Sequence, residues 1–211
     1  MIIPGFSVYW IMMLHMHYRY YGDLAFISRY TPELEKLLAF YVNHMNSRTG
    51  LIENTGYWQF VDWVSEWNRG CPSEREDNYI YSMMVSYAFH LASELYEAVG
   101  DLLRAQTYMT YADSLNASLN MYAWSETEQV YLDAPDSPTR SQHAQLWAVL
   151  ADVCTGQRAG KVLQKALSGS FCKASYSMSF FLFRAMEKAG LYERSEQMLT
   201  QWRDFVLDGA T

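Results

Sequence analysis

Tryptophans and carboxylates gather in one short stretch of this 211-residue sequence. Residues 54–70 read NTGYWQFVDWVSEWNRG and hold three of the chain's seven tryptophans. Sugars present apolar C–H faces that match indole rings, and a rim of hydroxyls that carboxylates bind. Trp58, Asp62, Trp63 and Glu66 are therefore candidate saccharide ligands.

Composition narrows the kinds of partner that the chain can have. The formal net charge is −7 and no basic cluster occurs, which argues against nucleic acid as a partner. The apolar run near the start contains His15 and Arg19, so it is not expected to cross a membrane or to act as a secretory leader. The three cysteines are far apart, which gives neither a disulfide framework nor a zinc signature. No residues have the spacing of metal ligands, so no metal ligand is named and no cofactor is predicted; whether calcium is bound stays open on sequence alone.

Helical periods run through the rest of the chain, and strand patterns are almost absent. Four segments are apolar on most faces, at residues 7–21, 78–99, 142–154 and 176–189. Each is followed by a segment with a single apolar face, and the first of these is expected to begin at Thr31, where a capping residue precedes Pro32. Helices that are apolar all round are buried, whereas one-faced helices cover them. The pattern predicts four hairpins, each with an inner and an outer helix.

Two long links, residues 47–77 and 123–139, interrupt the hairpins and enter the N-terminal ends of inner helices. Their unequal spacing differs from the constant period of a helical-repeat array, and long irregular links are commonly functional. We therefore predict one all-α domain over residues 1–211, forming about four of the six hairpins of an α/α toroid. Trp10, His143 and Tyr176 lie near the same helix ends and are further candidate ligands.

Several ordered motifs resemble the six-hairpin catalytic domain of bacterial α-L-rhamnosidases, glycoside hydrolase family 78. Residues 49–63, TGLIENTGYWQFVDW, are similar to the family's Gly-Leu turn and the aromatic stretch that ends in Asp-Trp. Residues 7–41, 141–153 and 175–211 resemble its hairpins, so the likeness covers nearly the whole chain. The resemblance implies an (α/α)6 barrel, a rhamnose-containing carbohydrate as substrate, and inverting hydrolysis of terminal α-L-rhamnosides.

The resemblance also implies that both catalytic carboxylates come from outside this sequence. The family's general acid precedes the point that corresponds to Met1, and its general base follows the Gly-Ala-Thr at residues 209–211. The acidic segment CPSERED, residues 71–77, follows the Asp-Trp motif instead and is interpreted as a helix-capping region. No catalytic residue is therefore named, and the chain alone is expected to be inactive. An incomplete ring would also expose apolar faces of residues 7–21 and 176–189, which favours self-association.

Two other classes of protein stay open on sequence alone. One is a helical-repeat scaffold that binds a protein partner, although the uneven hairpin spacing and the aromatic loop count against it. The other is a different α/α-toroid enzyme, such as a trehalase-like or glucoamylase-like hydrolase or a polysaccharide lyase.

Overall fold

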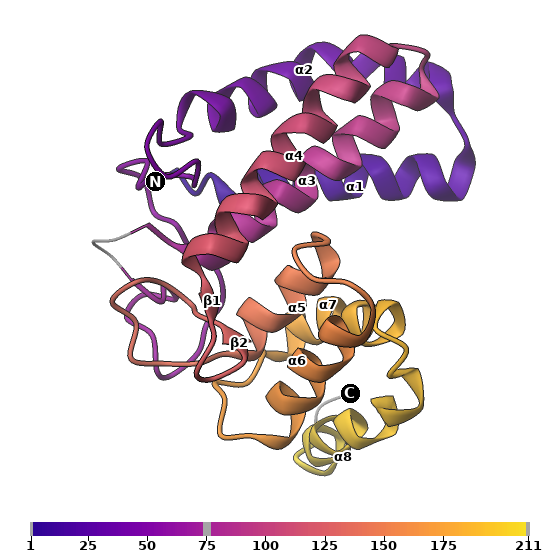
Figure 1. Ribbon diagram of the computed structural model, residues 1–211. Helices are drawn as coiled ribbons and strands as arrows, with labels where there is room; N and C mark the ends of the chain where they lie inside the picture. Colours follow the sequence, from indigo (N-terminus) through magenta and orange to yellow (C-terminus); the bar gives the residue numbers. More distant parts are fainter. Residues whose placement is uncertain (1, 74–76, 210–211) are drawn as a thin grey trace.

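The computed structural model describes residues 2–73 and 77–209, which form four consecutive helical hairpins (Figure 1). The first helices of the hairpins are α1 (Gly5–Tyr21), α3 (Tyr79–Ala98), α5 (Gln142–Leu150) and α7 (Tyr176–Lys188). The second helices are α2 (Leu24–Asn43), α4 (Leu102–Tyr122), α6 (Gly156–Ser168) and α8 (Leu199–Leu207), which follows the 3₁₀ helix η1 (Tyr192–Met198). In the described residues, strand structure is confined to the pair β1 (Trp124–Ser125) and β2 (Val130–Tyr131), so the all-α prediction is confirmed.

The first helices form an inner layer and the second helices an outer one. α1 packs on α3, α3 on α5, and α5 on α7. Every residue of α5 is buried, whereas α6 buries one face only, through Ala159, Val162, Leu163 and Ala166. The predicted alternation of inner and outer helices, and with it the toroid architecture, is confirmed.

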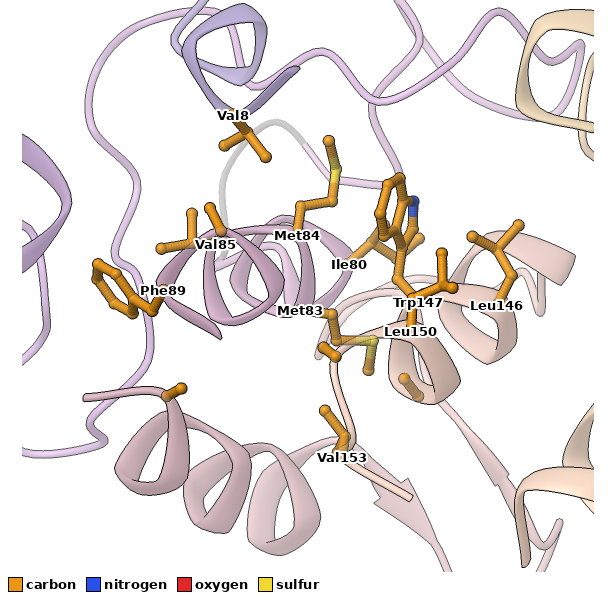
Figure 2. Close-up of a cluster of buried hydrophobic side chains, with 14 of the residues drawn as sticks. Val8, Ile80, Met83, Met84, Val85, Phe89, Leu146, Trp147, Leu150 and Val153 are labelled. Atoms are coloured by element: carbon orange, nitrogen blue, oxygen red, sulfur yellow. The ribbon is translucent and has the colours of Figure 1, made fainter. Parts of the chain in front are cut away.

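The core lies where α1, α3 and α5 meet (Figure 2). Val8 of α1, Met84 of α3 and Trp147 of α5 lie together there and are fully buried. Aromatic side chains extend this packing to the last inner helix, because Tyr9 of α1 stacks on Phe181 of α7 with ring centroids 5.8 Å apart. Burial of side chains of this size contributes about 1.5–3 kcal/mol each, so the core stabilises the inner layer strongly.

α2 begins earlier than the sequence predicts. Asp23 caps this helix by accepting a hydrogen bond from the Phe26 amide at 2.9 Å, so the helix starts at Leu24 and Pro32 lies inside it. Proline was expected in the first turn because it lacks an amide proton. The aspartate cap defines the start well upstream of Pro32, and the helix continues through the proline. The prediction of a start at Thr31 was therefore wrong.

Large apolar side chains remain exposed on the hairpins at the two ends of the layer. Phe6 and Met13 on α1, Phe180 on α7 and Leu207 on α8 are each more than half exposed. The outer element of the last hairpin, expected as one helix over residues 191–207, is divided into η1 and α8. Self-association through these end faces stays a prediction.

Two long links connect the hairpins and carry most of the irregular structure. The aromatic link, residues 44–78, joins α2 to α3, and the hairpin link, residues 123–141, joins α4 to α5 and contains β1 and β2. A third, shorter link joins α6 to α7. In Figure 1 the aromatic link and the hairpin link lie on the same side of the molecule, close to the starts of α3 and α5.

Candidate functional site

The aromatic link folds back onto the N-terminal ends of two inner helices. Asp62, near the middle of this link, is only 2% exposed. Its carboxylate meets His143, the second residue of α5, and Ser175, the N-cap residue of α7. The link is therefore fastened to residues that are more than 80 and 110 positions away in the sequence.

Four hydrogen bonds saturate the Asp62 carboxylate. Its Oδ2 accepts from His143 Nε2 at 2.7 Å and from the Ser175 amide at 2.9 Å. Its Oδ1 accepts from Ser175 Oγ at 2.7 Å and from the Trp63 amide at 2.8 Å. A carboxylate in this state holds neighbouring groups in place, because few of its lone pairs remain for a ligand.

These donors also determine the charge of Asp62. Burial raises the pKa of its carboxyl group, but the hydrogen bonds from His143 and Ser175 outweigh that effect and hold the pKa below its usual value. An ionised carboxylate requires a donor at His143 Nε2, so this nitrogen carries the ring proton. The other ring nitrogen, Nδ1, is buried and has no hydrogen-bond partner among the described residues.

Next to Asp62 lies a group of rings that we call the aromatic cluster, consisting of Phe6, Trp58, Phe60 and Trp63. The Trp63 ring lies 5.1 Å from that of Phe60 and 5.8 Å from that of Trp58, measured between centroids. Phe6, in the first turn of α1, packs edge-on against Phe60 at 6.3 Å. Trp63 is 65% exposed and Phe6 54%, so these two rings are the parts of the cluster that face solvent.

A tight turn at Arg69 and Gly70 supports the cluster from behind. Both residues have positive φ, +52° and +71°, and the Arg69 carbonyl accepts a hydrogen bond from Trp58 Nε1 at 2.9 Å. A Cβ at Gly70 would approach the Phe60 ring to 2.6 Å, so only glycine fits both the backbone conformation and the packing.

The structure brings together four of the seven residues that the sequence singled out. Trp58, Asp62, Trp63 and His143 meet at the N-terminal ends of α1, α5 and α7. Glu66 is exposed, accepts a hydrogen bond from Ser65 Oγ at 2.8 Å, and lines a different cavity of about 310 Å³ between the two long links.

Trp10 and Tyr176 lie away from the aromatic cluster. Trp10 faces α2, where its ring meets Tyr30 edge-on at 6.1 Å. Tyr176 faces α8 and packs on Trp202 and Phe205, each at 5.0 Å. A position near the start of an inner helix was the only reason to select these two residues, and the side of the helix on which they lie directs both rings toward an outer helix.

Other residues of the site were missed by sequence reasoning. Ser175 is an N-cap residue that also binds Asp62, and a serine directly before the apolar run of α7 is the signal that could have indicated the cap. Trp67 packs on His143 with centroids 4.8 Å apart, and Thr139 accepts a hydrogen bond from Trp67 Nε1 at 3.1 Å. Nothing in the sequence pattern pairs positions 67 and 139.

Within residues 2–73 and 77–209, no group of three or more His, Cys, Asp or Glu side chains is arranged to hold a metal ion. None of the helices in that part of the chain combines the length and the apolar character that crossing a bilayer requires.

The model of one protein family matches residues 3–179, and it describes the bacterial alpha-L-rhamnosidase six-hairpin glycosidase domain. The chain belongs to this family. Membership of this family rules out the two alternative interpretations of the sequence, a helical-repeat scaffold and a different α/α-toroid enzyme. No curated protein matches the chain.

Solved structures of rhamnosidases share the fold of this glycosidase domain. The GH78 family rhamnosidase of Bacillus sp. GL1 is 25% identical, with a TM-score of 0.85 over 98% of this chain and 22% of that protein. A rhamnosidase from Klebsiella oxytoca, solved with rhamnose bound, is 17% identical, with a TM-score of 0.84 over 99% of this chain and 39% of that protein. The chain therefore spans less than half the length of either protein.

Proposed function

We propose that this chain forms the sugar-binding part of an α-L-rhamnosidase catalytic domain. The observation that carries the proposal is the exposed Trp63 ring, whose backbone is fixed by the buried Asp62 carboxylate. L-Rhamnose is a 6-deoxy sugar, so its methyl group and C–H faces form an apolar surface that an indole ring matches. Family membership and the rhamnose found in the Klebsiella oxytoca enzyme support this choice of sugar.

We further propose that the longer enzyme hydrolyses terminal α-L-rhamnosides with inversion of configuration. Inversion requires a general acid and a general base roughly 6.5–9.5 Å apart, with a water molecule between base and sugar. Asp62 is saturated by hydrogen bonds and Glu66 is exposed to water, so neither has the surroundings of a tuned proton-transfer group. As the family resemblance implies, we assign the catalytic pair to residues outside this sequence, and we expect the 211-residue chain to bind sugar without turning it over.

Saturation-transfer NMR on the 211-residue chain tests sugar binding. L-Mannose is the matched control, since it differs from L-rhamnose only by a hydroxyl on C6. L-Rhamnose is expected to receive saturation, most strongly at its methyl group, and L-mannose to receive less. Equal signals for both sugars, or no signal for L-rhamnose, would contradict the proposed recognition.

Hydrolysis of p-nitrophenyl α-L-rhamnoside tests the assignment of the catalytic groups. The chain alone is expected to release no nitrophenol above the rate of a heat-denatured sample. Turnover near the usual glycosidase range, of order 10 s⁻¹, from a purified sample would show that the catalytic carboxylates lie within this sequence after all.

A further inference from the structure

We propose that Thr139 is a positioning residue for the solvent-facing Trp63, and that it acts through Trp67 and His143. The inference rests on the proposed function, because it concerns the ring assigned to the sugar. Thr139 belongs to the hairpin link, which contributes no residue to the aromatic cluster. The proposal therefore makes one long link responsible for the geometry of the other.

The first half of this connection consists of hydrogen bonds at the Thr139 hydroxyl, which also lies 2.8 Å from Ser137 Oγ. Trp67 Nε1 donates to Thr139 Oγ1 at 3.1 Å, and Thr139 Oγ1 donates to Asp133 Oδ2 at 2.8 Å. Asp133 is fully buried and Trp67 is 6% exposed. Without the hydroxyl, both groups would lose a partner at a place where little water can replace it.

The second half runs from Trp67 to Trp63. The Trp67 ring packs on the His143 imidazole at 4.8 Å with the two planes inclined by 49°. In the described residues His143 makes one hydrogen bond, from Nε2 to Asp62, so packing holds the rest of the imidazole ring, and the Trp67 ring contributes to that packing. Asp62 in turn accepts the Trp63 amide at 2.8 Å, which fixes the backbone that carries the exposed ring.

Thr139 suits this role because its hydroxyl can accept from Trp67 while it donates to Asp133. Valine has nearly the same shape but supplies neither bond, whereas serine supplies both without the methyl group. Thr139→Val and Thr139→Ser are therefore a matched pair that separates the hydrogen bonds from the packing. Trp67→Phe removes the opposite partner, since phenylalanine keeps an aromatic ring against His143 but has no N–H.

The experiment uses the 211-residue chain labelled with 5-fluorotryptophan, which gives one ¹⁹F resonance for each of the seven tryptophans. Trp63→Phe assigns the Trp63 resonance. The position and width of this resonance report the environment of the ring, and L-rhamnose titration gives the dissociation constant. Thr107→Val is the control, because among the described residues this exposed hydroxyl bonds to the Leu103 carbonyl alone, within α4 at 2.8 Å.

Thr139→Val is expected to shift or broaden the Trp63 resonance and to weaken L-rhamnose binding by up to about tenfold, a limit set by the stability cost of losing one buried hydrogen bond. Thr139→Ser should restore both, and Thr107→Val should change neither. Trp67→Phe should reproduce the valine variant, and the double variant should add nothing, because both substitutions break the same connection.

The proposal is overturned if Thr139→Val lowers the melting temperature but leaves the Trp63 resonance and the affinity unchanged. It is also overturned if the effects of Thr139→Val and Trp67→Phe on Trp63 are additive. If Thr139→Val does not fold, Trp67→Phe takes its place: a shifted Trp63 resonance supports the proposal, and an unchanged resonance and affinity overturn it. Failure of the proposed function is distinguishable, because the unsubstituted chain would then not bind L-rhamnose while the Trp63 resonance still responded to Thr139→Val.

Discussion

Replacing Asp62 with asparagine should destabilise the whole fold, although the residue lies in a link. The side-chain shape is kept, but one carboxylate oxygen becomes an NH₂ group. If that NH₂ takes the Oδ2 position, it faces two N–H donors, from His143 and Ser175. If it takes the Oδ1 position, it faces the Trp63 amide, while the Ser175 hydroxyl can turn to accept. At least one buried donor therefore loses its acceptor in either orientation.

The magnitude follows from the charge and the burial of the site. Hydrogen bonds to an ionised group contribute about 1.5–3 kcal/mol each, and the bonds that remain weaken when the charge is lost. The free energy of unfolding of Asp62→Asn should therefore fall by about 2–4 kcal/mol. Urea unfolding followed by circular dichroism at pH 7 measures this change. Asp113→Asn, on the exposed face of α4, is the control and should stay within about 0.5 kcal/mol of the wild type.

The pH dependence gives a second measure of the same interaction. The folded-state pKa of Asp62 lies below the value of about 3.9 expected for the unfolded chain, so its ionised form stabilises the fold. This contribution is fully present above the unfolded pKa and is lost as the pH falls through the folded pKa. The difference in stability between wild type and Asp62→Asn should therefore narrow below about pH 4. A difference under about 0.5 kcal/mol at pH 7 would refute the reasoning.

Three further substitutions test other parts of the molecule. Trp63→Ala should weaken L-rhamnose binding at least about fivefold. It should change the free energy of unfolding by less than about 1 kcal/mol, because the residue is 65% exposed. NMR titration and urea unfolding measure the two effects, and a large loss of stability would show that the ring is structural. The hydrogen bond from His15 is the main cause of the lowered pKa of Glu94, and a lowered pKa gives stability that is lost in acid. Glu94→Gln should therefore lose less stability than the wild type as the pH falls below about 4.3. An unchanged dependence of the unfolding free energy on pH in this range would contradict this. Asp133→Asn should change the stability at pH 7 by less than about 1 kcal/mol in urea unfolding, unlike Asp62→Asn.

The architecture could be predicted from the sequence because helical period and burial are linked. A helix that is apolar all round has no stable place except an inner layer, and α3 and α5 follow this rule. The start of α2 was predicted wrongly because two local signals compete there, the cap at Asp23 and the proline at position 32. Only the structure shows that the helix tolerates Pro32 in its interior.

The site could be predicted only in part, since a sequence gives residue types but not directions. Trp63 and His143 were expected on the face of the toroid where links and helix starts meet, and both contact Asp62 there. Trp10 was selected by the same rule, yet its side of α1 directs the ring to α2. Thr139 could not be found at all, because its role depends on a contact with Trp67 across 72 positions.

Asp62 and Asp133 are both buried carboxylates at the ends of inner helices, but their surroundings have opposite effects. Burial is the largest single influence on the pKa of each carboxyl group. At Asp133 it raises the pKa, because the hydrogen bonds from Ser141 and Thr139 offset the effect of burial only in part. Hydrogen bonds prevail at Asp62. Because the folded-state pKa of Asp133 is raised, its ionisation lowers the stability of the fold once the pH exceeds the pKa of the unfolded chain. Replacing Asp133 with a neutral residue removes this penalty, which offsets part of the stability lost with the carboxylate's hydrogen bonds.

The hydrogen-bond partners of Asp133 explain why asparagine should be tolerated there. Its Oδ1 accepts from the amide and the hydroxyl of Ser141 at 3.1 and 2.7 Å, and an asparagine oxygen can do the same. The NH₂ group would then face Thr139 Oγ1, a hydroxyl oxygen with two lone pairs. Thr139 could accept from both this NH₂ group and Trp67, and donate instead to Ser137 Oγ, which lies 2.8 Å away. Asp133→Asn should therefore keep the Trp63 resonance at its wild-type position. A shifted Trp63 resonance in a stably folded Asp133→Asn variant would show that the charge of Asp133 itself is needed to hold the link.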